Sequence, residues 1–222
     1  MVEDSLSRRR LLKTTGTAAT AAIATGATIG TGSLSGCLGL FGGDLPECEG
    51  DQITDATLPA KGATEAPVTV AVYSDYACSH CATWALEKAP ELADEIEQGR
   101  IRYVHHDFPI PVSDRSMPAA NAARAVHYHD GAEAFWPYER LLFENQGSLG
   151  TETLANLANE AGASPETARS AAETLPFCQT IKEDRSAASD RGVSGTPTVF
   201  VEDETFVNPS VETVRTAIDD RV

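Results

Sequence analysis

The stretch Cys78-Ser79-His80-Cys81 follows an apolar run, 68–73, and precedes a segment of helical character, 82–88. The apolar run is typical of a buried strand, so the two cysteines stand at a strand-to-helix junction. Positions i and i+3 of a helix share one face, which lets the two sulfurs close a small disulfide. The first cysteine falls at the helix N-terminus, where free N–H groups and the helix dipole favour a thiolate. The stretch therefore predicts a redox-active pair, Cys78 and Cys81.

A structural zinc site is the alternative interpretation of this pair. Zinc takes four ligands, usually from a second C-x-x-C or from two suitably spaced histidines. The other cysteines, Cys37, Cys48 and Cys178, are isolated, and no second cysteine pair accompanies the histidines at 105–106 or 127–129. The pattern favours redox chemistry, and neither a metal nor an organic cofactor is expected.

A second motif, Gly192-Val193-Ser194-Gly195-Thr196-Pro197-Thr198, leads into a short apolar run, 199–201. Proline is tolerated at the start of a strand, where no ladder N–H is needed. A cis Thr196–Pro197 bond would hold this loop in a tight turn beside the cysteines. Taken alone, the loop favours a trans proline that enters an edge strand; together with the cysteine pair it favours the cis turn.

Together these motifs make the chain resemble the DsbA-like branch of the thioredoxin superfamily. The resemblance rests on residues 73–81, on His106-Asp107-Phe108-Pro109 and on residues 192–198, and it covers about residues 65–222. It implies an α/β protein with a thioredoxin fold and an inserted helical subdomain, which catalyses thiol–disulfide exchange with protein substrates.

The resemblance also assigns roles to residues of both motifs. It implies that Cys78 is the accessible, attacking sulfur and Cys81 the resolving one. It implies that Pro197 is a cis-proline and that Thr196 offers its backbone to a bound substrate peptide. His80 matches the family pattern as well, and an imidazole beside the thiolate would stabilise it and favour an oxidising couple.

Two positions depart from the family pattern and bear on the direction of exchange. Ser79 stands where DsbA-type oxidases often have proline, and Val72 stands where relatives often place a buried acidic residue. We expect an oxidant of protein substrates. A disulfide reductase or isomerase on the same site and a non-catalytic, metal-handling thioredoxin-like module are the alternatives.

The first 36 residues read as an export signal rather than as part of the fold. Arg8-Arg9-Arg10 fits a twin-arginine signal, and an uncharged Thr-, Ala- and Gly-rich stretch follows. Leu34-Ser35-Gly36-Cys37 resembles a lipoprotein cleavage box, with Cys37 as the lipidated residue. An ordinary cysteine or an uncleaved anchor is the alternative. We expect an extracytoplasmic lipoprotein on the outer face of the cell membrane. Its expected partners are exported proteins with thiols or disulfides and an unidentified protein that recycles the cysteine pair.

The chain is strongly acidic, with 33 Asp and Glu against 17 Lys and Arg. Because the first 36 residues hold two acidic and four basic residues, the net charge of −16 becomes −18 for residues 37–222. Such self-repulsion destabilises a compact state in dilute buffer and is screened in concentrated salt. We therefore expect a halophilic source; an acidic surface that docks basic partners is the competing interpretation. The absence of a basic patch argues against nucleic-acid binding.

The rest of the chain divides into a linker and one domain. Residues 37–64 are rich in Gly, Asp, Glu and Pro and predict a flexible tether, and residues 65–222 predict the domain, with a helix-rich insertion at about 113–175. Cys48 and Cys178 remain once the other cysteines are assigned. Sequence leaves open whether they form a structural disulfide or stay free. The other elements expected in the domain are a helix from 78 to 98 that is broken at Pro90, a strand at 101–105, a helix at 176–191, a hairpin over 198–207 and a helix after Ser210.

Overall fold

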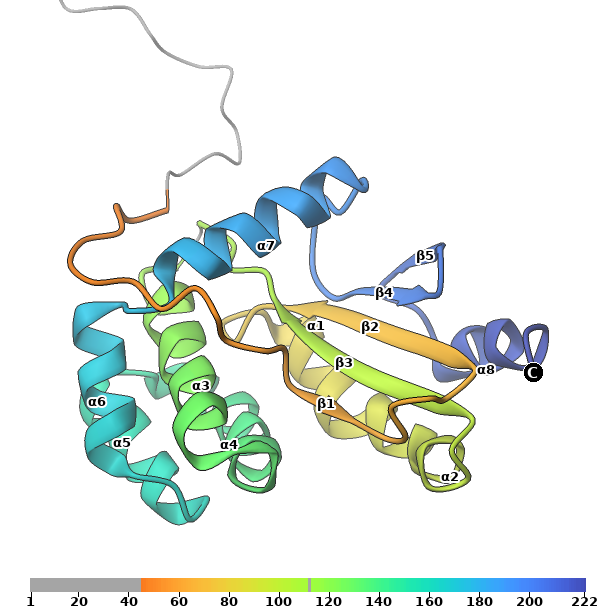
Figure 1. The fold of residues 1–222 in the computed structure, drawn as a ribbon, viewed down its shortest axis with the longest axis horizontal. Helices are drawn as coiled ribbons and strands as arrows, with labels where there is room; N and C mark the ends of the chain where they lie inside the picture. The colour runs from red at the N-terminus through yellow and green to blue at the C-terminus, as the bar shows by residue number, and fades with distance from the viewer. Residues whose placement is uncertain (1–44, 112) are drawn as a thin grey trace, which may run out of the picture. The chain divides into compact units, whose positions relative to one another are not determined.

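The computed structural model describes residues 45–111 and 113–222 (Figure 1). The predicted twin-arginine signal, the lipoprotein box and Cys37 lie outside the described residues. No helix in the described ranges is both long and apolar enough to cross a membrane.

Five strands form one mixed sheet at the centre of the domain (Figure 1). They are β1 (Ala60–Lys61), β2 (Val68–Ser74), β3 (Ile101–Asp107), β4 (Thr198–Val201) and β5 (Glu204–Val207). Their order is β1-β3-β2-β4-β5, in which β2 and β3 are parallel and all other neighbours are antiparallel. This arrangement of a parallel pair followed by a hairpin gives the predicted thioredoxin-type sheet.

The alternation of side chains along β2 explains why both faces of the sheet are covered. Val68, Val70 and Val72 belong to a core shared with β4 and with the helices of one face. Ala71 and Tyr73 belong to a second core on the opposite face. A strand buried on both faces reads as a nearly continuous apolar run, which is the pattern that the sequence shows.

Helical segments cover the two faces. On the first face lie α1 (Ser79–Thr83), the π-helix η1 (Trp84–Lys88), the 3-10 helix η2 (Ala89–Leu92), α2 (Ala93–Glu97) and the C-terminal helix α8 (Val211–Asp219). The expected break at Pro90 takes the form of the 3-10 turn η2, where a residue without an N–H is tolerated. On the opposite face, α7 (Cys178–Asp190) packs its Ala188 against Phe200 and Tyr73.

The helical insertion follows β3 and precedes α7. It consists of α3 (Ser116–Asp130), α4 (Ala132–Glu144), the 3-10 turn η3 (Gln146–Ser148), α5 (Thr151–Glu160) and α6 (Pro165–Thr174), which gather at one side of the sheet (Figure 1). Apolar residues of these helices share a core with Tyr76 and Cys81. The insertion therefore packs directly against the segment that carries the cysteine pair.

Residues 45–64 differ from the flexible tether predicted for residues 37–64. Ile53 donates its N–H to Pro176 O at 2.8 Å, and β1 pairs with the edge of β3. Cys48 and Cys178 form a disulfide, with Cα atoms 5.5 Å apart and 130 residues between them in sequence. Backbone hydrogen bonds do not require a hydrophobic periodicity in the sequence. The composition of this segment therefore suggested a linker. The disulfide left open by the sequence is present.

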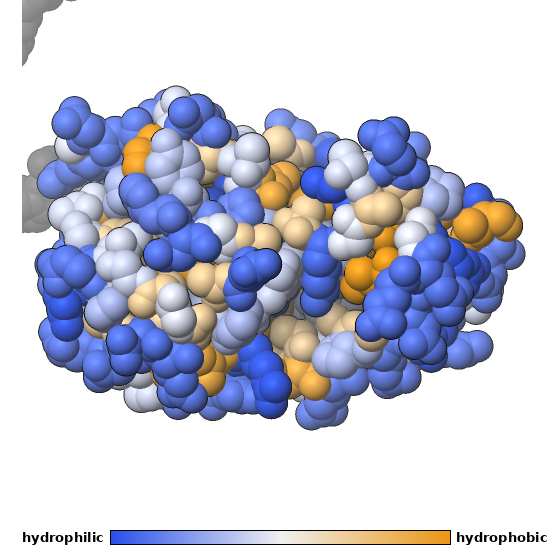
Figure 2. All heavy atoms as spheres, turned by 60° about the horizontal axis from the view of Figure 1, so that its bottom comes forward, coloured by the Kyte–Doolittle hydropathy of each residue, from blue (hydrophilic) through white to orange (hydrophobic). Residues whose placement is uncertain are grey.

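Hydrophilic side chains cover most of the face seen in Figure 2, and apolar residues form small patches between them. Among the described residues, Tyr128, Val207 and Val222 are the exposed large hydrophobic side chains. Most large apolar side chains of the described residues thus lie in the cores.

Candidate active site

The two cysteines differ in accessibility. Cys78 immediately precedes α1, and its carbonyl accepts the N–H groups of Cys81 and Ala82 at 3.0 and 3.1 Å. Both cysteines are free thiols; Cys78 is half-buried and Cys81 is fully buried. Of the pair, only Cys78 can meet a macromolecular substrate, as its predicted attacking role requires.

The surroundings of Cys78 stabilise its thiolate. A hydrogen bond with the Cys81 thiol is the largest influence, and contacts with Thr196 and with the backbone N–H groups of Cys81 and His80 add to it. These outweigh desolvation and lower the pKa of Cys78 to about 5. Burial and the contact with Cys78 raise the pKa of Cys81 far above that of a free thiol. At neutral pH the reduced pair therefore holds one thiolate, on Cys78.

The cis-proline loop lies directly beside Cys78. The Thr196–Pro197 bond is cis, and Cys78 Sγ lies 3.4 Å from Thr196 O, to which it donates when it is protonated. Tyr73 of β2 pairs with Thr198 of β4, which brings the end of one strand next to the start of the other. The sheet thus joins the two sequence motifs at one edge.

His80, by contrast, is exposed on the first turn of α1. Its backbone N–H contributes to stabilising the Cys78 thiolate. A role for its imidazole stays a prediction.

A buried carboxyl group that the sequence analysis missed lies near the pair. Asp75 is 2% exposed, and its carboxylate accepts hydrogen bonds from Ala77 N at 2.6 Å, Ile110 N at 2.5 Å and Ser116 Oγ at 2.9 Å. Desolvation raises its pKa, against the effect of these donors. Its backbone N–H lies 3.5 Å from Cys81 Sγ. A buried acidic residue thus stands three positions before Cys78 rather than at Val72, and its position was visible in the sequence.

A buried ionic cluster lies behind the pair and was also missed. His105 Nδ1 is 2.8 Å from Glu139, and Arg124 contacts Asp107 at 2.7 Å and Asp184 at 3.2 Å. His105 and His106 lie near the end of β3, and His127 and His129 lie in the last turn of α3. Arg124 within the alanine-rich stretch 119–126 was the available signal, since an unpaired arginine there would be costly.

The charges in this cluster follow from its contacts. Burial opposes the charged form of His105, but hydrogen bonds to Asp107 and Glu139 raise its pKa to about 9. Burial likewise opposes ionisation of Asp107, but Arg124 and His105 lower its pKa to about 2. The Tyr76 hydroxyl lies 3.3 Å from His105 Nε2, so the cluster reaches to within two residues of Cys78.

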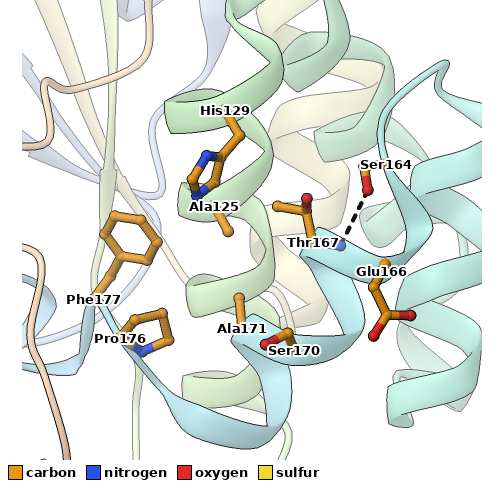
Figure 3. A pocket seen from close by; sticks show the side chains of 9 residues that line it. All are labelled: Ala125, His129, Ser164, Glu166, Thr167, Ser170, Ala171, Pro176 and Phe177. Atoms are coloured by element: carbon orange, nitrogen blue, oxygen red, sulfur yellow. Dashed lines mark hydrogen bonds between the residues drawn. The ribbon is translucent and has the colours of Figure 1, made fainter.

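Other features of the described residues offer no second reactive centre. No group of three or more His, Cys, Asp and Glu side chains there is arranged to hold a metal ion. A hollow between α3 and α6 is lined by polar side chains, including those of His129, Ser164 and Thr167, and by Phe177 (Figure 3). Neither cysteine of the pair lines it.

The low pKa of Cys78 gives a direct expectation for pH dependence. Alkylation of the reduced protein by iodoacetamide should follow thiolate formation with a midpoint near pH 5. Peptide mass spectrometry of the alkylated protein would place the label on Cys78. A midpoint above about pH 8, the range of a free thiol, would show that the surrounding donors do not stabilise the thiolate.

Comparison with known proteins agrees with this geometry. A family model described as thioredoxin matches residues 54–220. The probable disulfide bond formation protein D of Bacillus anthracis is 26% identical over 172 residues, which cover 74% of this chain and 78% of that protein. The crystal structure of oxidised BdbD from Bacillus subtilis superposes with a TM-score of 0.69 at 22% identity, over 78% of this chain and 98% of that one. The thiol-disulfide exchange protein α-DsbA2 of Wolbachia pipientis gives a TM-score of 0.64 at 26% identity, over 77% and 90%.

The matched region contains both the cysteine pair and the cis-proline loop that meet at the edge of the sheet. The chain therefore belongs to the thioredoxin family and, within it, to the DsbA-like thiol:disulfide oxidoreductases.

Proposed function

We propose that this protein oxidises the thiols of exported proteins, with Cys78 and Cys81 as its redox pair. The observation that carries the proposal is the set of donors around Cys78 Sγ, which stabilises the thiolate that exists only in the reduced protein. Stabilising the reduced form makes the disulfide form a stronger oxidant. The accessible position of Cys78 and the burial of Cys81 support the assignment of their roles.

The exchange balances as two successive thiolate attacks. A substrate thiolate attacks Cys78 Sγ of the disulfide, a mixed disulfide forms, and Cys81 leaves and takes up a proton. A second substrate thiolate then attacks the substrate sulfur of the mixed disulfide and releases Cys78 as a thiolate. The substrate is oxidised by two electrons, which reduce the cysteine pair. A separate redox partner must remove these electrons to complete a cycle.

The cis-proline loop supports a site for the substrate backbone. Thr196 O lies 3.4 Å from Cys78 Sγ, so a peptide whose sulfur reaches Cys78 passes beside the backbone of Thr196. An extended peptide there can use main-chain hydrogen bonds, which bind without requiring a particular side chain. We propose that Thr196 and Pro197 form this subsite.

The same site run in the opposite direction is the second candidate, favoured by Ser79 in place of proline. Two assays at equal protein concentration separate the directions: oxidative refolding of a reduced, disulfide-containing protein, and reduction of insulin by dithiothreitol. We expect faster oxidative refolding and little acceleration of insulin reduction. Faster reduction than oxidation would contradict the proposed direction and leave the assignment of the site intact.

We further propose that the protein acts outside the cytoplasm as a lipoprotein attached through Cys37. Arg8-Arg9-Arg10 and the box that ends at Cys37 support this, as does the presence of the Cys48–Cys178 disulfide, since such bonds persist in oxidising compartments. Cell fractionation tests the anchor. Wild-type protein should sediment with membranes and the Cys37→Ala variant should not; equal membrane association of both would overturn the anchor.

A further inference from the structure

Gln146 makes two hydrogen bonds that are not involved in the proposed mechanism. It is the first residue of η3, within the helical insertion, and it is half-buried. Its side-chain nitrogen lies 2.8 Å from Tyr76 O and 2.8 Å from Cys78 O. A side-chain amide has two N–H donors, so both are directed to the segment that ends at the nucleophile.

We call the segment Tyr76-Ala77-Cys78 the redox turn. It connects the end of β2 to α1, and its conformation sets the direction of Cys78 Sγ. Two backbone N–H groups lie between the two bridged carbonyls: that of Ala77 donates to Asp75 Oδ1 at 2.6 Å, and that of Cys78 donates to Asp75 O at 3.0 Å. Asp75 Oδ1 also accepts the hydroxyl of Ser116, from α3, at 2.9 Å. The insertion therefore contacts the carbonyl groups of the redox turn directly through Gln146, and its Ser116 is linked to the Ala77 N–H through the Asp75 carboxylate.

The contacts of Gln146 also have an electrostatic consequence. Carbonyl oxygens carry partial negative charge and, without compensation, disfavour a thiolate close by. A donor that approaches these oxygens offsets that effect. Cys78 O already accepts two N–H groups of α1. Tyr76 O accepts its side-chain hydrogen bond from Gln146. A neutral amide supplies the donors without adding a charge of either sign.

We propose that Gln146 is a positioning residue for the redox pair, which holds the redox turn and stabilises the Cys78 thiolate through the two carbonyl groups that it binds. The inference rests on the proposed function, in which Cys78 is the nucleophile. It gives the helical insertion a part in setting the strength of the oxidant, beside covering the site.

The alternative is a purely structural role, in which Gln146 only stabilises the packing of the insertion against the sheet domain. Three substitutions distinguish the two roles, because their side chains are of similar reach. Gln146→Met has no donor, Gln146→Lys keeps donors and adds a positive charge, and Gln146→Glu replaces the donors by a negative charge. A purely structural role predicts losses of stability without a corresponding change in the titration midpoint of Cys78. A positioning role predicts a titration midpoint of Cys78 that is lowest in Gln146→Lys, higher in Gln146→Met and highest in Gln146→Glu.

The readouts are the thiolate titration of Cys78, followed by its absorbance at 240 nm, and the equilibrium of the cysteine pair with glutathione. In Gln146→Met the midpoint should rise by about one unit, which destabilises the thiolate of the reduced form. The constant for oxidation of glutathione by the protein should then fall up to about tenfold at pH 7. Gln146→Glu should shift both quantities further, and Gln146→Lys should stay at or below the wild-type midpoint.

Gln179→Met is the matched control, because Gln179 is exposed and its amide donates to Glu183 on the same helix at 2.9 Å. It should leave both quantities unchanged. Equal midpoints for wild type and all three Gln146 variants would overturn the inference. If Gln146→Met does not fold, Gln146→Lys and Gln146→Glu are compared instead. The inference then requires a higher Cys78 titration midpoint in Gln146→Glu than in Gln146→Lys, and the reverse order would overturn it. Failure of the wild type itself to exchange disulfides would instead refute the proposed function.

Discussion

Replacing Cys81 by serine is expected to arrest exchange at the mixed disulfide between Cys78 and a substrate. Cys78 keeps the contacts from Thr196 and from backbone N–H groups that favour its thiolate, so it still attacks disulfides. The serine cannot displace the bound substrate, so the covalent complex accumulates. Replacing Cys78 by serine should reduce catalysis to the uncatalysed rate, because Cys81 is fully buried and its pKa is strongly raised.

Non-reducing gel electrophoresis after acid quenching, with a substrate that contains a single disulfide, measures the trapped complex. The Cys78→Ser variant is the matched control, because it also keeps one cysteine of the pair but retains Cys81 in place of Cys78. Equal trapping by the two variants, or trapping by Cys78→Ser alone, would reverse the assigned roles. Circular dichroism of both variants would verify that the fold is retained.

Replacing Arg124 by methionine is expected to destabilise the protein by up to about 3–5 kcal/mol, the cost of removing one partner of a buried ion pair. Arg124 is 1% exposed and contacts Asp107 and Asp184, and its removal leaves the buried Asp107 with His105, 3.3 Å away, as its remaining cationic partner. Methionine keeps most of the volume, so a cavity contributes little. Denaturant unfolding in molar salt, which screens the surface charge, would give the difference in free energy of unfolding.

Arg140→Met is the control for this loss, because the Arg140 side chain is 72% exposed and pairs with Glu144 one turn along the same helix. Its removal should cost less than about 1 kcal/mol. A cost below that value for Arg124→Met as well would show that the cluster contributes little to stability.

The contacts of the cluster also fix the sign of its pH dependence. The folded-state pKa of His105 is raised to about 9, so its contribution to stability is present below its unfolded pKa of about 6.5. That contribution is lost as pH rises through 9. The pKa of Asp107 is lowered to about 2, so its contribution is present above about pH 4 and is lost as pH falls through 2. Neutral pH thus retains most of the contribution of both groups.

Sequence predicts the parts of this fold that local patterns specify. The apolar run before Cys78 is β2, the proline of the second motif is cis, and the hairpin lies at 198–207. Ser210 is the N-cap of the C-terminal helix and accepts the N–H of Thr213. For the strand, the hairpin and the N-cap, the physical cause lies within a few residues of the signal. The cis proline was instead favoured only together with the distant cysteine pair.

The parts that sequence did not predict depend on contacts between distant residues. The Cys48–Cys178 disulfide, the pairing of β1 with β3 and the ordered course of residues 45–64 require knowledge of which segments meet. Gln146 and Arg124 are single polar residues whose importance appears only when their partners, far away in sequence, are placed beside them. Roles of this kind follow from the packing of the insertion against the sheet.

The central claim, that this protein is an oxidant, is tested most directly by the reduction potential of the Cys78–Cys81 pair. Equilibration with glutathione in molar salt, followed by alkylation and peptide mass spectrometry, measures this pair separately from the Cys48–Cys178 disulfide. The stabilised Cys78 thiolate predicts a potential above about −200 mV, on the oxidising side of the glutathione pool. A potential near about −270 mV, as in thioredoxin, would contradict the claim and identify a reductase.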